Sequence, residues 1–283
     1  MTQRFFVLLS AILISTTGYG QGLKGTTYAE AQQSRSGTLV CTYVTTPGFV
    51  EPSHEGEKGL SVGLMDAFIE WVKREKHIVL TKEIRVIGDP SDFTNFMGNI
   101  RSSKGGVFGL GNITITDTRK KEFNMSDPFL PNVSIMVTHN SVPTLNSLDD
   151  LPRTFAGFTC YVVKGTTNAE RMYDLKKNRF PSLNIVEVAS SEETLERVSQ
   201  DPKSFTNLDF TYYIAIFKRG LPLKRHPAGD NSDEDLGVIM PKSNDWAPVF
   251  NEFLNSGYLQ SPEYRTLLAK NLHRDIINIL DAM

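Results

Sequence analysis

Residues 111–119 read GNITITDTR, and residues 123–129 read FNMSDPF. The first stretch is an alternating strand end that carries Thr114 and Thr116 on one face and reaches Arg119 within one turn. Hydroxyl and backbone groups at a strand end, followed by a guanidinium, can hold both ends of a free α-amino acid. The pattern therefore predicts a binding site for a small zwitterionic or carboxylate solute.

The same stretch resembles the ligand-binding segment of periplasmic amino-acid-binding proteins and of the related ionotropic glutamate receptor cores. Their version reads roughly (P/G)-L-T-I-T-x-x-R-x-x-x-(V/I)-D-F-S-x-P-(Y/F). The resemblance runs from residues 36–39 to the helices after Trp246 and is sharpest at residues 107–129. It implies a bacterial extracellular solute-binding protein of the polar amino-acid type. The fold implied is α/β with two lobes, the type II periplasmic binding fold, in which each lobe is an open sheet with flanking helices and the ligand cleft lies between the lobes.

Three positions depart from the family pattern. Gly109 stands where relatives often carry aspartate, Asn112 where they carry glycine or proline, and Asn124 where they carry aspartate. The segment after the first predicted strand also lacks the common Pro-Pro-Phe form. These departures leave the identity of the ligand open.

Strand and helix patterns alternate on both sides of the motif. Strands are predicted at 37–44, 78–87, 107–113, 133–138, 158–163, 185–188 and 236–240, and a further strand opens at Leu208. Helices are predicted at 60–73, 91–101 with Ser91 as N-cap, 167–176, 191–198, 212–217, 246–254 and 262–272, with a weaker one at 28–32. Such alternation predicts sheets covered on both faces, with ligands outside the carboxyl ends of the strands.

The order of these elements predicts two lobes. Lobe 1 comprises residues 37–135 plus 240–283, and lobe 2 comprises residues 136–239. The chain crosses between them near residues 134–140 and 235–241. Closure of the two lobes over a ligand by a hinge motion is expected for this layout.

The N-terminus has the pattern of a secretory signal peptide. Arg4 is followed by an apolar run at residues 5–15 and by small residues up to Gly20. The alternative is a membrane anchor, but the run is shorter than the roughly 20 residues that span a bilayer. We therefore expect a signal peptide at residues 1–20, cleaved before Gln21, and a secreted or periplasmic protein. There is no cysteine near the cut, which argues against a lipid anchor there.

Charge, cysteine and histidine content argue against a nucleic-acid-binding surface, a disulfide and a metal site. Without Arg4 the chain has 29 basic and 32 acidic residues, a net charge of −3, which gives no basic surface for nucleic acid. The two cysteines, Cys41 and Cys160, are expected as buried free thiols, since a disulfide between the lobes would lock the hinge. The five histidines are scattered without metal-ligand spacing, so neither a metal nor a cofactor is expected.

In lobe 1, Arg119 is the main candidate for ligand binding, because a guanidinium forks onto a carboxylate through two parallel hydrogen bonds. The alternative is a surface arginine. The resemblance implies that Thr114 and Asn112 offer a hydroxyl and a backbone carbonyl to the ligand's amino group, although Thr114 could instead bond its own backbone. It also implies that Phe49, in a Pro-Gly-Phe loop, covers the ligand. The alternative for Phe49 is the apolar core, and Tyr43 is a weaker candidate for the lid.

In lobe 2, the segment KGTTNAE at residues 164–170 follows a strand and opens a helix, whose free N–H groups form an anion site. A capping box of Thr167 with Glu170 is compatible with this site. The resemblance implies that Thr166 and Thr167 bind the same carboxylate as the arginine. It further implies that Asp209 pairs with the ligand's ammonium group, the alternative being a helix N-cap.

Together these residues predict an extracytoplasmic protein that binds an amino acid or a similar small carboxylate solute. The expected partners are this ligand and an ABC-type permease to which a monomeric binding protein delivers it, with no role for nucleic acid. One alternative is an enzyme on the same scaffold, similar to cyclohexadienyl dehydratases, in which Glu51, Glu170 or Asp209 could act as the general acid. The other alternative is a sensory solute-binding protein.

Overall fold

A computed structural model of the protein describes residues 22–272 and residue 277, except for the side chain of Ile214. The signal peptide expected at residues 1–20 lies outside these described residues.

The described chain alternates between strands and helices. The strands are β1 (Lys24–Gly25), β2 (Ser36–Tyr43), β3 (Val79–Ile84), β4 (Lys104–Gly105), β5 (Val107–Thr114), β6 (Phe123–Met125), β7 (Leu130–His139), β8 (Thr159–Val163), β9 (Asn184–Val188), β10 (Ser204–Asp209), β11 (Leu223–Arg225) and β12 (Asn231–Pro241). The helices are α1 (Tyr28–Ser34), α2 (Leu60–Lys76), α3 (Phe93–Ser102), α4 (Asp117–Glu122), α5 (Leu151–Thr154), α6 (Thr167–Asn178), α7 (Ser191–Gln200), α8 (Thr211–Arg219), α9 (Ala247–Leu254) and α10 (Pro262–Asn271).

Most of the predicted elements are present, two local predictions are wrong, and one helix was not predicted. The N-cap of α3 is Asp92, whose side chain accepts from the Asn95 backbone, and not Ser91. The strand expected to open at Leu208 is instead the end of β10, which begins at Ser204. Helix α4 was not predicted, because its six residues are polar and have no apolar period.

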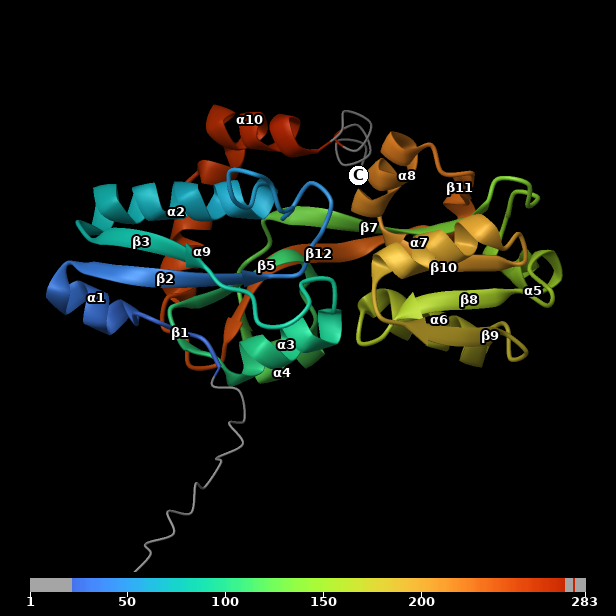
Figure 1. Cartoon of the computed structure of the whole chain (residues 1–283), viewed down its shortest axis with the longest axis horizontal. Coiled ribbons are helices and arrows are strands. Elements are labelled where there is room, and N and C mark those ends of the chain that lie inside the picture. The colour runs from blue at the N-terminus through green and yellow to red at the C-terminus, as the bar shows by residue number, and fades with distance from the viewer. Residues whose placement is uncertain (1–21, 273–276, 278–283) are drawn as a thin grey trace, which may run out of the picture.

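The main sheet has two halves with parallel strands, and a central pair of antiparallel strands joins them. Its order is β3-β2-β5-β12-β7-β10-β8-β9, with β6 beside β12 and β11 beside β7. The pairs of β2 with β3 and β5 are parallel, as are those of β8 with β9 and β10. Strands β7 and β12 run antiparallel to each other and pass from one half to the other, as Figure 1 shows. The fold is therefore the predicted two-lobed α/β architecture.

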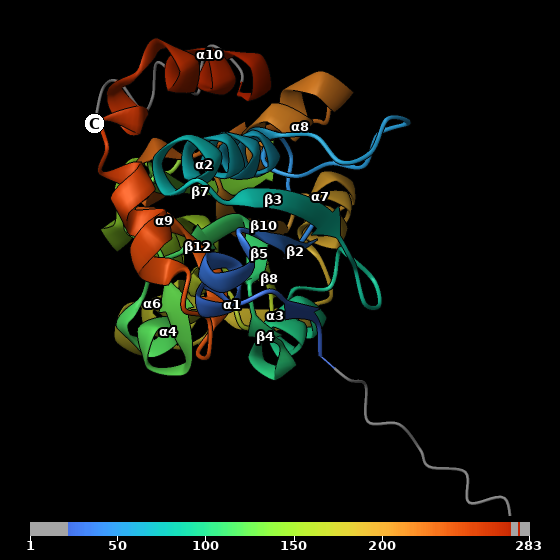
Figure 2. The ribbon, with the colours of Figure 1, turned by 90° about the vertical axis from the view of Figure 1, so that its left-hand side faces the viewer.

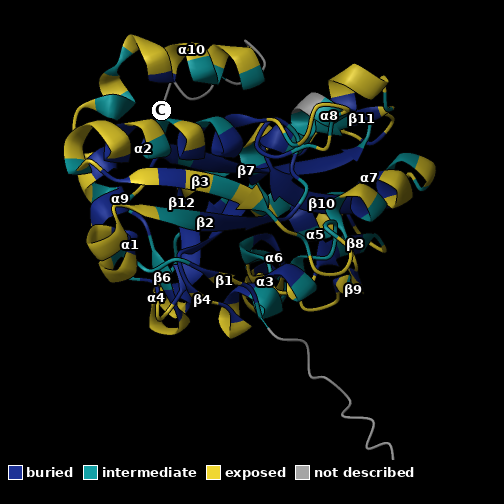
Figure 3. Cartoon of the chain, turned by 60° about the vertical axis from the view of Figure 1, so that its left-hand side comes forward, coloured by how far each residue is buried: buried dark blue, intermediate teal, exposed yellow. Residues whose placement is uncertain are grey.

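Helices cover both faces of each half. In the first lobe, α2 lies on one face of the sheet, and α1 and α3 lie on the other (Figures 1 and 2). In the second lobe, α8 and α6 lie on opposite sides of β10 and β8 (Figure 1). The strands are mostly buried, whereas the outer faces of the helices are exposed (Figure 3). Among the described helices, none is long and apolar enough to cross a membrane.

The two crossing strands connect the halves through their hydrogen-bond partners. Strand β12 pairs with β5 through Leu236 and with β7 through Asn231. Strand β7 pairs with β10 over Ser134–Thr138. The predicted lobe boundaries fall within or at the ends of these strands, and the exact division of the chain into lobes stays a prediction.

Both lobes have apolar cores, and the largest apolar cluster runs from the first lobe into the second, where it includes Leu195, Leu208 and Phe210. In the first lobe, Phe68 of α2 is fully buried at the centre of an aromatic cluster. Its ring centre lies 4.8–6.5 Å from those of Trp71, Phe108, Trp246, Phe250 and Phe253. Cys41 belongs to this core and Cys160 to the core of the second lobe. Both cysteines are buried free thiols, as predicted.

Candidate ligand-binding site

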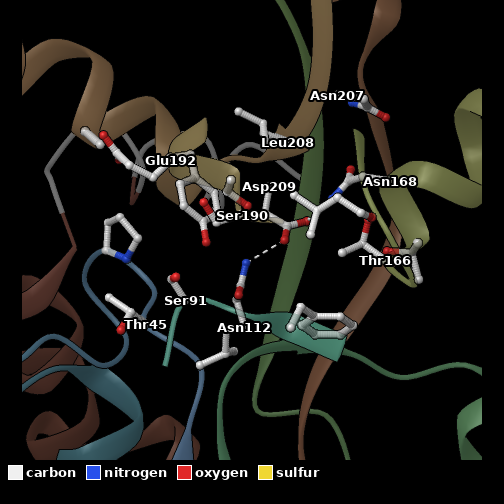
Figure 4. Close-up of a pocket in the computed structure, with 18 of the residues that line it drawn as sticks. Thr45, Ser91, Asn112, Thr166, Asn168, Ser190, Glu192, Asn207, Leu208 and Asp209 are labelled. Atoms are coloured by element: carbon white, nitrogen blue, oxygen red, sulfur yellow. Dashed lines mark hydrogen bonds between the residues drawn. The ribbon is translucent and has the colours of Figure 1, made fainter. Parts of the chain in front are cut away.

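A cavity of about 390 Å³ lies between the two lobes (Figure 4). Much of its lining lies at or just beyond the carboxyl ends of the parallel strands β2, β5, β8 and β10, and further residues come from α8 and from the starts of α3 and α7. This is the place where open α/β sheets bind ligands, because the strand ends and the helix N-termini that follow them face the same crevice. The volume is within the range of roughly 300–1,000 Å³ that is usual for small-molecule sites.

Six of the seven predicted binding residues line this cavity. The first lobe contributes Asn112, Thr114 and Arg119, and the second contributes Thr166, Thr167 and Asp209. The convergence of residues from both lobes could not be derived from their spacing in the sequence. The structure brings these six together, while their contact with a ligand stays a prediction.

Arg119 is held at the start of the short helix α4. The side chain of Thr116 caps this helix by accepting from the Arg119 backbone N–H at 3.1 Å. The guanidinium donates to the Thr114 carbonyl at 2.7 Å and to the Gly165 carbonyl of the opposite lobe at 3.5 Å. Its carbon lies 5.4 Å from the ring centre of Phe93, a cation–π contact.

The guanidinium of Arg119 is buried without a carboxylate on it. The residue is 9% exposed, and within the described part of the chain its only hydrogen-bond acceptors are the two carbonyls. Burial lowers the pKa of Arg119, and the more distant charges of Asp209, Glu170 and Glu234 partly offset this. Because a guanidinium has five N–H groups, donors remain for an anion in the cavity.

Asp209, at the end of β10, is surrounded by amide groups. Its Oδ1 accepts from Nδ2 of Asn132 at 2.9 Å and from Nδ2 of Asn168 at 3.2 Å. Its Oδ2 accepts from Nδ2 of Asn112, across the cleft, at 2.5 Å. The pKa of Asp209 is raised to about 6, chiefly by burial and also by the Glu234 charge, while the hydrogen bonds from the Asn132 and Asn168 amides and the charge of Arg119 oppose the rise.

Helix α6 begins at the cavity in the second lobe. Its N-cap is Thr166, whose hydroxyl accepts from the Ala169 N–H at 3.2 Å and donates to the Val163 carbonyl at 2.8 Å. The predicted capping box of Thr167 with Glu170 is therefore wrong, because the cap is Thr166 and the residue three positions after it is Ala169. The Thr167 hydroxyl is instead 3.4 Å from that of Thr114 in the other lobe. Asp209 makes no cap on the helix that follows it, so the N-cap alternative for Asp209 is wrong too.

Solved structures of amino-acid-binding proteins share this architecture. An ancestral arginine-binding protein bound to arginine is 20% identical, with a TM-score of 0.65 over 83% of this chain and 98% of that one. The GluR0 ligand-binding core from Nostoc punctiforme, in complex with L-glutamate, is 18% identical, with a TM-score of 0.63 over 83% and 99%. A structure described for glutathione import via GshT and the cystine ABC importer TcyBC of Streptococcus mutans is 19% identical, with a TM-score of 0.69 over 83% and 94%.

The fold is that of the type II periplasmic binding proteins. No family model and no curated protein sequence matches the chain, so the likeness lies in the structure. Several of the structural neighbours are named as amino-acid-binding proteins or, for GluR0, as a ligand-binding core.

Phe49 does not line the cavity, so the prediction that it covers the ligand in this periplasmic-binding-protein fold is corrected. Phe49 is completely buried in the core of the first lobe, 6.3 Å from the ring of Phe129. A Cβ on Gly59, where φ is +136°, would lie 2.2 Å from the Phe49 carbonyl oxygen, so the loop is packed tightly against the start of α2. Tyr43 is likewise buried in this core. The apolar alternative for Phe49 is therefore the one that the structure supports.

Three residues around the cavity were not predicted. Phe93 provides the aromatic face beside Arg119, and Asn168 and Asn132 supply amides to Asp209. For Asn132 a signal existed, because it is a polar residue in a mostly apolar strand and is fully buried in the structure. Buried polar groups need partners, and a buried asparagine next to a predicted cleft is a candidate for the site. Phe93 falls on the same apolar helix face as core residues, so its position in the sequence does not show whether it packs in the core or lines the cavity.

Asp209 should make stability depend on pH. Its pKa is about 6 in the folded state against 3.8 for an ordinary aspartate, so the folded state takes up a proton first as the pH falls. As the pH falls from 7.5 to 3.8, we expect the free energy of unfolding of the parent to rise by up to about 3 kcal/mol relative to that of Asp209→Asn. Urea unfolding of both proteins across this range measures the difference. A difference that stays constant, or falls with decreasing pH, would contradict the assignment.

Proposed function

We propose that the protein is an extracytoplasmic binding protein for a small carboxylate solute, with amino acids and similar acids as the candidate class. The observation that carries the proposal is Arg119, a nearly buried guanidinium in an interlobe cavity with carbonyls as its only acceptors in the described structure. A buried charge is costly unless it is paired, and the carboxylate of a ligand would pair it.

The anion would be bound from both lobes. Arg119 offers parallel N–H donors from the first lobe, and the N-terminus of the twelve-residue helix α6 offers backbone N–H groups and a positive dipole end from the second. Hydrogen bonds to charged groups contribute roughly 1.5–3 kcal/mol each. Three or four of them, less the cost of association, correspond to micromolar affinity, about −8 kcal/mol.

Closure of the cleft would complete the site. Three contacts already cross it: Asn112 with Asp209, Thr114 with Thr167, and Arg119 with the Gly165 carbonyl. Strands β7 and β12 are the two covalent connections between the lobes, so bending within them would open and close the cleft. Binding and release then require no chemistry.

We propose that the closed, ligand-bound form delivers its ligand to an ABC-type importer. Support comes from structural neighbours, since one is described as the substrate binding protein of an amino acid ABC transporter. The signal-peptide pattern at residues 1–20 agrees with export, and we propose that the exported protein acts as a monomer.

One observation favours the enzyme alternative. Asp209 faces the cavity with a pKa of about 6, which is near the value suited to a general acid at neutral pH. A dehydratase similar to cyclohexadienyl dehydratases would release water and carbon dioxide from prephenate. Incubation of the protein with prephenate or arogenate tests this alternative by product formation.

Thermal-shift screening of residues 21–283 tests the binding function. The screen covers the twenty amino acids, small carboxylates and, as cationic controls, polyamines. A ligand at 100 times its dissociation constant should stabilise the folded state by about 2.7 kcal/mol. We expect a carboxylate to raise the melting temperature of the parent protein but not that of Arg119→Ala. If polyamines alone give a shift, or if no carboxylate does, the proposed function is wrong.

A further inference from the structure

The hydrogen bond between Asn112 and Asp209 crosses the middle of the cavity, as Figure 4 shows. On one side of it, Asn168 belongs to the first turn of α6, which begins beside Arg119. On the other side lies Glu192, in the first turn of α7. We call this second part of the cavity the α8 subsite; its lining includes Val44, Pro47, Glu192, Tyr212, Ala215 and Arg219.

One face of α8 forms a wall of this subsite. Tyr212, Ala215 and Arg219 are spaced by three and four residues, so they lie along one face of the helix, and all three line the cavity. Arg219 forms an ion pair with Glu192, which places this end of the face at the start of α7. Phe217 falls on another face of α8 and is 61% exposed. Ala215 therefore marks the middle of the wall, with space in front of its small side chain.

The walls of the subsite are mainly apolar. From the first lobe, Val44 and Pro47 line it, in the loop that follows β2. From the second lobe comes the ring of Tyr212. Burial raises the pKa of Tyr212 to about 12, and hydrogen bonds with Ser191 and with Thr46 of the opposite lobe partly offset this rise. Since the protein already engages the hydroxyl, the ring is the part of Tyr212 that remains for a ligand.

The charged residues of the α8 subsite are engaged or exposed to solvent. Glu192 and Arg219 pair with each other, and their side chains are 50% and 40% exposed. Oε2 of Glu51 accepts from the Gly48 N–H of its own loop at 3.0 Å, and Lys218 is exposed. Ion pairs with such exposed groups add little to binding, because water already solvates them.

The charges that a ligand could neutralise with more effect lie in the rest of the cavity. Arg119 and Asp209 are each 9% exposed, and neither forms an ion pair within the described residues. Charges interact more strongly where the surroundings exclude water. The charged groups of a ligand therefore fit beside these two residues, and the remainder of the molecule extends into the α8 subsite.

We propose that the α8 subsite takes an uncharged, largely apolar side chain, so that the preferred ligands are carboxylic acids with an aliphatic or aromatic group. Burial of such a group against Pro47, Tyr212 and Ala215 should strengthen binding about fourfold for each methylene removed from water. A terminal ammonium or carboxylate group would lose hydration and meet only exposed partners at the rim. The inference rests on the proposed function and narrows it.

The test compares matched acids that differ only at the far end of the side chain. Three pairs are amino acids: L-norleucine with L-lysine, L-norvaline with L-glutamate, and L-phenylalanine with 4-carboxy-L-phenylalanine. Two pairs lack the amino group: hexanoate with 6-aminohexanoate, and pentanoate with glutarate. Dissociation constants are measured by titration calorimetry, in which the stoichiometry also reports the fraction of folded protein.

Ala215→Asp and Phe217→Asp form a matched pair of variants. Both add one negative charge to α8, but only Ala215 faces the cavity, whereas Phe217 is exposed. A carboxylate in the subsite should weaken binding of an apolar side chain and favour one that ends in an ammonium group. The same charge at residue 217 should leave the dissociation constants as they are in the parent.

In at least one pair, we expect the parent and Phe217→Asp to bind the apolar member at least tenfold more tightly than the charged member. Ala215→Asp should weaken binding of that apolar member at least tenfold. A parent that binds the charged members as tightly, or an Ala215→Asp variant that binds as the parent does, would overturn the inference and leave the proposed function intact. The same holds if the parent binds none of these ten acids but binds another carboxylate in the thermal-shift screen. If it binds no carboxylate at all, both fail.

Discussion

Arg119→Ala is expected to weaken the binding of any carboxylate ligand by about 2–5 kcal/mol, which is roughly 30-fold to several thousand-fold in the dissociation constant. The variant removes the two parallel N–H donors of the guanidinium and leaves the carboxylate of the ligand without its charged partner. The free energy of unfolding should change little. Arg119 is 9% exposed and has carbonyls as its acceptors in the described structure, so the loss of two hydrogen bonds is offset by relief from burying a charge.

Calorimetry with the ligand that the thermal-shift screen finds provides the measurement. Arg119→Lys keeps the charge but loses the planar fork, so its affinity should lie between those of the parent and the alanine variant. Arg74→Ala, at an exposed site on α2 whose ion pair is with its neighbour Glu75, is the matched control and should bind as the parent does. If Arg119→Ala binds as tightly as the parent, Arg119 is not the carboxylate site.

Phe68→Ala is expected to lower the free energy of unfolding by about 3–5 kcal/mol. Phe68 is fully buried, and five aromatic rings surround it within 6.5 Å. The substitution removes its transfer energy and leaves a cavity that these large rings can fill only in part, since each is held by other neighbours. The effect should therefore be near the upper end of what one substitution produces.

Denaturant unfolding of the parent and the variant measures this loss. Phe217→Ala is the matched control, because Phe217 is 61% exposed on α8 and its truncation should change stability by less than about 0.5 kcal/mol. Similar losses for the two variants, or a loss below about 1 kcal/mol for Phe68→Ala, would show that the aromatic cluster is not the stabilising centre of the first lobe.

The fold was predictable because hydrophobic periods give the order of strands and helices. The helical period through Leu64, Phe68 and Trp71, for example, marks the face of α2 that packs on the sheet. The β7–β12 pair was predictable only as two crossings, since which strands join across the middle depends on partners far apart in the sequence. Helix α4 escaped prediction because Thr116 and Asp117 stabilise it by capping and charge rather than by apolar packing.

The candidate site was predictable where a residue type has one strong chemical use. Arg119 was recognised through its guanidinium and its place after the threonines of the strand end, and Asp209 through the family resemblance, and both line the cavity. The aromatic residues were not separable in this way. Phe49 and Phe93 both lie near turns at the ends of strands and helices, but tertiary packing buries Phe49 in the core and leaves Phe93 at the cavity. Only the three-dimensional arrangement decides which aromatic side chain meets Arg119.

The central strand pair has a consequence for how the protein is made. Strand β5 receives its antiparallel neighbour β12 through pairs such as Leu236 with Thr114, so a growing chain exposes one edge of β5 until the whole second lobe has been synthesised. The strand itself is apolar, since the side chains of Phe108, Leu110 and Ile113 are all buried in the finished protein. Unpaired apolar edges associate with one another. A chain that is exported while unfinished would therefore depend on a chaperone to keep this edge apart from other chains until β12 arrives.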